Sequence, residues 1–65
     1  MGAGVFCGIG YAHRLQKNYK QALYYMDQAL EQEPENSDFF IQRSQIYTDI
    51  NRFEMSNRDL TQALE

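Results

Sequence analysis

The chain repeats itself with a period of 34 residues. The tetrapeptide QALE at residues 28–31 recurs at 62–65, and the same shift places Phe6 on Phe40, aromatic on aromatic. A period of this length is typical of architectures in which each copy is one supersecondary unit that buries its apolar face against its neighbours. With 65 residues, the chain holds two such copies.

Each copy contains two runs of apolar residues with helical spacing. In the first copy Phe6, Ile9, Gly10 and His13 lie within one arc of about 100° on a helix, and a second amphipathic run begins at Tyr19. No segment shows the period-2 alternation of a strand, so we predict an all-α fold. The predicted helices span residues 4–16, 19–32, 38–49 and 53–64.

Polar residues and the single proline separate these helices. Asn18 and Asn51 are predicted N-caps, because each has a Gln or Glu three residues later that can reach back to the helix start. Pro34 cannot continue a helix and ends the second one. Ser37 then is the predicted cap of the third helix.

This pattern resembles the tetratricopeptide repeat, whose signature is W-x2-L-G-x2-Y, then A-x3-F, then P. The first copy carries these positions as Phe6, Ile9, Gly10, His13, Ala22, Met26 and Pro34, and the second as Phe40, Arg43, Ser44, Tyr47, Ser56 and Leu60. The resemblance covers residues 3–65. It implies two helix-turn-helix repeats, 3–36 and 37–65, stacked as a short right-handed superhelix, an α-solenoid fragment, with the second repeat ending before its proline and without a capping helix.

The small residues and two departures from the signature carry structural expectations. Gly10 is expected where the paired helices touch, because a small residue lets them approach closely. His13 replaces the usual Tyr and is expected to pack as a ring in the core. Arg43 replaces Leu, and we expect its stem to lie on the core while its guanidinium stays in water.

The resemblance implies a protein-protein interaction module that binds a protein segment in a concave groove lined by the first helix of each repeat. The residues expected to line this groove are Gly4, Cys7, Tyr11, Arg14, Leu15, Asp38, Ile41, Gln45, Thr48 and Asp49. Tyr and Arg are the residue types most often found as hot spots, which favours Tyr11 and Arg14. The alternative is that Tyr11 and Leu15 simply pack on the next repeat. Because Cys7 and Tyr11 stand where a carboxylate-gripping subclass has Lys and Asn, such a clamp is not expected.

Enzymatic chemistry finds little support in the sequence. Cys7 and His13 could in principle act as a nucleophile and a base, but a spacing of six residues places them about 240° apart around a helix. One cysteine and one histidine cannot form a tetrahedral Cys/His metal site. We therefore predict no enzyme, no metal and no cofactor.

The expected partner is a protein or peptide. A net charge of −3 disfavours nucleic acid, which leaves an RNA-binding helical repeat a distant alternative. No apolar run approaches a membrane span, and a single cysteine favours the cytoplasm. A second possibility is a structural or self-associating element that forms homo-oligomers through uncapped repeat ends, or a fragment of a longer array. The opening GAGVFCGIG, residues 2–10, lacks the strand that a phosphate-binding loop follows, and we interpret it as a first helix weakened by glycine.

Overall fold

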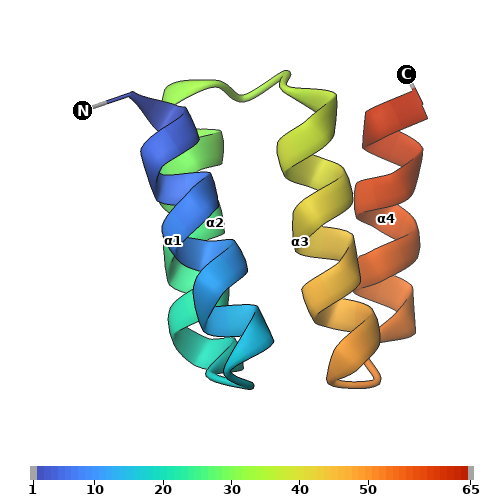
Figure 1. Cartoon of the computed structure of the whole chain (residues 1–65). Helices are drawn as coiled ribbons and strands as arrows, with labels where there is room; N and C mark the ends of the chain where they lie inside the picture. Colours follow the sequence, from blue (N-terminus) through green and yellow to red (C-terminus); the bar gives the residue numbers. More distant parts are fainter. Residues whose placement is uncertain (1, 65) are drawn as a thin grey trace.

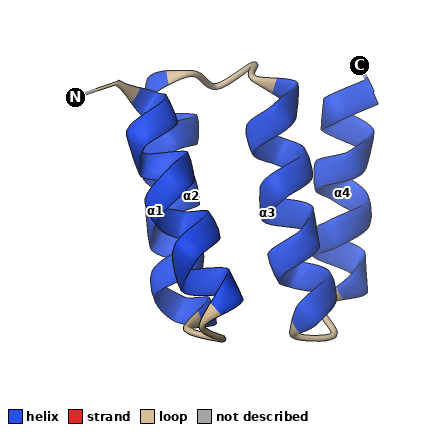
Figure 2. Cartoon of the chain, in the orientation of Figure 1, coloured by secondary structure: helices blue, strands red, loops and turns tan. Residues whose placement is uncertain are grey.

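The computed structural model describes residues 2–64 as four helices joined by short turns. They are α1 (Ala3–Leu15), α2 (Tyr19–Gln32), α3 (Ser37–Asp49) and α4 (Phe53–Leu64). No strand occurs in the described part of the chain, as Figure 2 shows. The all-α prediction is confirmed, and each helix begins and ends within one residue of its predicted bounds.

The helices form two antiparallel pairs that stand side by side (Figure 1). α1 packs along α2, and α3 packs along α4. Between the pairs, α3 packs mainly on α2 and also touches α1. The first helix of the second pair therefore carries the contact between the two repeats.

The core lies where α3 meets the first helix pair. Met26 of α2 and Ile46 of α3 are fully buried, with Ala22 and Ala29 beside them. Gly10 faces this core from α1: a Cβ at this position would lie 3.0 Å from the Met26 sulfur and 3.1 Å from the Ala22 carbonyl oxygen. The expected close approach of the paired helices at Gly10 is confirmed.

Both turns within the pairs close in the same way, 34 residues apart. The Asn18 amide donates to the His13 carbonyl at 2.8 Å, and the Arg52 amide donates to the Tyr47 carbonyl at 2.7 Å. The preceding residue in each turn donates to the carbonyl three residues before it, Lys17 to Arg14 and Asn51 to Thr48. The two bonds together form the Schellman ending of a helix. It requires a left-handed residue, which is Lys17 (φ 63°) in the first turn and Asn51 (φ 62°) in the second.

Three capping predictions need correction. Asn51 is the left-handed residue of its turn and not an N-cap. Asn18 stands at the N-cap position of α2, but its side chain makes no capping bond and donates instead to Gln16. The cap of α3 is Asn36 rather than Ser37, because the Asn36 Oδ1 accepts from the Phe39 amide at 3.3 Å.

Lys17→Gly is expected to raise the free energy of unfolding by about 0.5–1 kcal/mol. A left-handed conformation costs an ordinary L-residue about 1–2 kcal/mol, and glycine avoids this cost. The greater freedom of glycine in the unfolded chain offsets part of the gain. Urea unfolding followed by helical circular dichroism measures the change. Lys17→Ala is the control: it removes the long charged side chain beyond the Cβ but keeps the Cβ, so a gain as large as that of glycine would contradict the conformational explanation.

Candidate functional site

The expected groove residues lie on α1 and α3, whose ribbons run side by side in Figure 1. We call this surface the α1–α3 face. It comprises Cys7, Tyr11, Arg14 and Leu15 of α1 with Asp38, Ile41, Gln45 and Asp49 of α3. Gly4 lies at the start of α1, where a Cβ would meet nothing within 4 Å.

Arg14 joins the two repeats at one end of the α1–α3 face. Its Nε donates to the Asp49 Oδ2 at 2.7 Å, and its Nη1 donates to the Gln45 Oε1 at 3.1 Å. The hydrogen bond to Asp49 raises the pKa of Arg14, so the guanidinium stays charged. Three residues predicted from separate repeats thus form one connected polar group.

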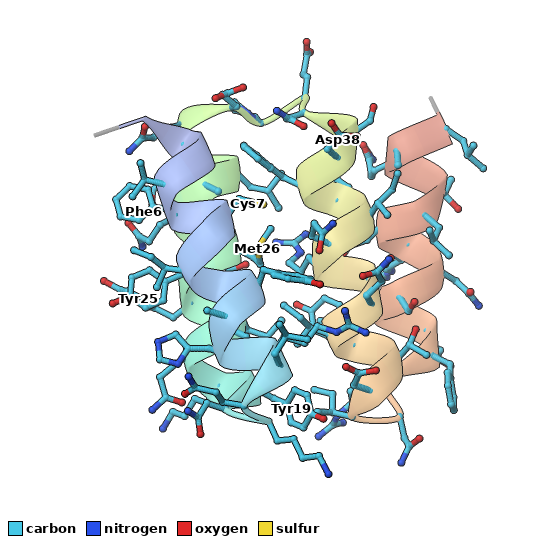
Figure 3. All side chains as sticks on the ribbon, viewed as in Figure 1. Phe6, Cys7, Tyr19, Tyr25, Met26 and Asp38 are labelled. Atoms are coloured by element: carbon cyan, nitrogen blue, oxygen red, sulfur yellow. The ribbon has the colours of Figure 1, made fainter. Side chains whose placement is uncertain are left out.

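Cys7 and Asp38 mark the other end of this face. Cys7 is half-buried and packs against the core from α1, and Figure 3 shows it on the side of α1 that faces α3. Burial raises the pKa of the Cys7 thiol above its ordinary value, and the negative charge of Asp38 raises it further. The thiol is therefore protonated at neutral pH and weakly nucleophilic.

Asp38→Asn is expected to speed the alkylation of Cys7 by iodoacetamide roughly twofold at pH 7.5. Removing the carboxylate lowers the Cys7 pKa and raises the thiolate fraction, and a screened charge pair is worth a few tenths of a kcal/mol. Alkylation rates measured against pH give the pKa directly. Glu31→Gln, an exposed carboxylate on α2, should leave the rate unchanged. Equal acceleration by both variants would show a general effect of net charge.

Apolar side chains occupy the surface between these two ends. Tyr11, Leu15 and Ile41 are all exposed. About half of the Tyr11 surface and more than half of the Leu15 surface are accessible beside the second repeat. The face thus combines accessible apolar area with polar groups at both ends.

Thr48 departs from its predicted orientation. It was expected on the side of α3 that faces away from α4, but its hydroxyl lies 2.8 Å from the Ser56 hydroxyl of α4. The same Oγ1 donates to the Ser44 carbonyl one turn earlier. A short hydroxyl side chain satisfies its hydrogen bonds locally, whereas the long Arg14 at the equivalent position of the first repeat reaches the neighbouring helix.

A second ionic group, which was not predicted from the sequence, is centred on Arg43. Its Nε and Nη2 form two parallel bonds of 2.9 and 2.8 Å to the carboxylate of the buried Asp59 on α4. Its Nη1 donates to the Asp27 Oδ1 of α2 at 2.8 Å. The guanidinium also lies within 6 Å of the ring centres of Phe40 and Tyr47. The expectation that the head of Arg43 stays in water is wrong, because two carboxylates replace the water.

His13 stacks on Tyr25 with ring centres 5.6 Å apart and nearly parallel planes. Its expected packing as an aromatic ring is confirmed. Phe6 lies on the other side of this aromatic group, 6.3 Å from Tyr25 (Figure 3). The neighbour of His13 is thus a tyrosine of α2, whereas Cys7 faces α3 and Asp38, so Cys7 and His13 do not form a nucleophile–base pair.

Among residues 2–64, no group of three or more His, Cys, Asp or Glu side chains is placed to hold a metal ion. None of the four helices described is both long and apolar enough to cross a membrane.

Comparison with known proteins gives one match. The family model described as the tetratricopeptide repeat matches residues 3–36, which is more than half of the chain. No curated protein and no solved structure matches. The matched residues contain α1 and α2, and α3 with α4 repeats their architecture. The repeat is a general protein-protein interaction module. By this match and by its two helix-turn-helix units, the chain belongs to the tetratricopeptide repeat family.

Proposed function

We propose that the chain is a non-enzymatic interaction module or scaffold that binds a segment of another protein along the α1–α3 face. The observation that supports this proposal is the exposure of Tyr11, Leu15 and Ile41 next to the polar group of Arg14. An exposed aromatic ring beside a fixed guanidinium is the combination that most often supplies binding energy at interfaces. Because Arg14 is held by two partners, it loses little side-chain freedom on binding.

The charges of the face suggest the chemistry of the bound segment. The Asp49 carboxylate is already engaged by Arg14, whereas Asp38 takes part in none of the ion pairs found among residues 2–64. A segment with an apolar side chain over Tyr11 and Ile41 and a basic side chain near Asp38 complements this arrangement. The single cysteine of the chain fits a reducing compartment, and we place the module in the cytoplasm.

A displayed library of random peptides tests the proposal. Peptides selected on the 65-residue chain should be enriched in segments that pair apolar with basic residues. Tyr11→Ala should weaken their binding about tenfold or more, since truncating a hot spot costs about 2 kcal/mol. The matched control is Tyr24→Ala, which truncates an exposed tyrosine on α2. Selected peptides that bind Tyr11→Ala as well as the parent chain would place the binding surface elsewhere.

A further inference from the structure

The outer surface of α4 carries apolar side chains that are buried at the equivalent positions of α2. Leu64 is 88% exposed, whereas Leu30, 34 residues earlier, is 7% exposed. Leu60 is 41% exposed, whereas its counterpart Met26 is fully buried. The difference arises because α3 covers α2, and no other described helix covers α4 in this way. We call Phe53, Leu60, Thr61 and Leu64 of α4 the tail face.

The opposite end of the molecule shows the complementary difference. Val5 of α1 is 46% exposed, whereas its counterpart Phe39 on α3 is 6% exposed. Ala12 of α1 is likewise exposed, whereas its counterpart Ile46 is buried. We call Val5, Ile9 and Ala12 of α1 the head face. The head face of α1 thus corresponds to the surface of α3 that packs on α2, and the tail face of α4 corresponds to the surface of α2 that receives it.

The charged contacts of that internal interface show whether the two faces fit each other. Arg43 of α3 pairs with Asp27 of α2 across it. The counterparts are Ile9 on the head face and Thr61 on the tail face, and both are uncharged. Had only one member of the pair been replaced, docking would bury a charge without a partner, which is strongly unfavourable.

The second charged contact of the internal interface is replaced in the same manner. Arg14 of α1 bonds to Asp49 and Gln45 of α3. Their counterparts across the two faces are Thr48 on one side and Leu15 and Tyr11 on the other, again without charge. Every charge in these contacts thus disappears together with its partner, so docking would bring only uncharged side chains together at these positions.

We propose that the head face of one copy docks on the tail face of a second copy, in the geometry in which α3 packs on α2. The contact joins two different surfaces, so each added copy leaves a free head and a free tail, and assembly continues beyond a dimer. This inference does not depend on the α1–α3 face binding another protein, but docking would cover Tyr11 and Leu15, which belong to that face as well.

Sedimentation velocity of the 65-residue chain over a wide concentration range tests this assembly. The weight-average mass should rise with concentration past the mass of a dimer. Leu60→Glu blocks the tail and Val5→Glu blocks the head, so each variant alone should stay monomeric. An equimolar mixture should form a dimer and nothing larger, because one variant retains a head and the other a tail. Met55→Glu is the control: Met55 is exposed on α4, but so is its counterpart Gln21, and the variant should assemble like the parent chain.

Two results would overturn the proposal. A parent chain that remains monomeric at all concentrations has no such contact. A blocked variant that still dimerises alone, with no further gain on mixing, joins head to head or tail to tail. Helical circular dichroism establishes that each variant is folded. Should Leu60→Glu unfold, Leu64→Glu blocks the same face at a side chain that is almost fully exposed.

Discussion

Replacing Arg43 with isoleucine is expected to lower the free energy of unfolding by about 3–5 kcal/mol. The substitution removes both bonds to the Asp59 carboxylate, which then remains buried without a cation, and breaking a buried ion pair from one side costs about this much. A chain of 65 residues seldom has more than roughly 3–5 kcal/mol of stability in total. The single variant should therefore be largely unfolded at 25 °C.

A double variant separates the ion pair from the shape of the side chain. The counterparts of Arg43 and Asp59 in the first repeat are Ile9 and Tyr25, so Arg43→Ile with Asp59→Tyr introduces the uncharged residues that the first repeat carries at these two positions. The double variant should regain most of the lost stability, because no charge stays buried alone. Urea unfolding followed by circular dichroism measures both variants. If the single variant loses less than about 1 kcal/mol, the buried-charge explanation fails.

Gly10→Ala is expected to lower the free energy of unfolding by about 1–3 kcal/mol, while Gly8→Ala raises it by about 0.5–1 kcal/mol. Both changes add one methyl group to α1. At Gly10 the methyl meets the Met26 sulfur at 3.0 Å and the backbone oxygen of Ala22 at 3.1 Å, so the two helices must separate. At Gly8 it meets nothing within 4 Å, and only the better helix propensity of alanine remains.

Thermal and urea unfolding of the two alanine variants provide the measurement. The comparison is internally controlled, because the chemical change and the helix are the same. Gly4→Ala should behave like Gly8→Ala, since a Cβ there is also in open space. Two variants that shift stability in the same direction would contradict the close helix contact at Gly10.

The helices could be predicted from the sequence because their apolar spacing and their 34-residue repetition agree with each other. The capping residues could not. Asparagine favours both the N-cap and the left-handed conformation, so Asn51 carried two meanings that only the path of the turn distinguishes. Asn36 and Ser37 are both good caps, and the chain uses the first.

The candidate site was predictable in its position and less so in its contacts. Repeat positions placed Arg14, Gln45 and Asp49 on the correct helices, but the reach of each side chain decided which groups met. Thr48 was misplaced because helical position alone ignores the length of a side chain. The sequence only weakly indicated that Arg43 would have a partner such as Asp59. The indication was that a cation at an apolar position of the repeat needs a nearby carboxylate. Which carboxylate it is depends on the packing of α3 between α2 and α4.

The three hydrogen bonds of the Arg43 guanidinium also affect the shape of any array built from this repeat. A planar guanidinium that holds Asp59 with two bonds and Asp27 with a third links α2 to α4, which do not pack on each other directly. Curvature in a solenoid is the sum of small rotations between neighbouring units. The ion pair between Arg43 and Asp27 links the two repeats across the α2–α3 interface. The neutral Ile9 and Thr61 would leave an interface between two copies without such a link, and that interface would be more flexible.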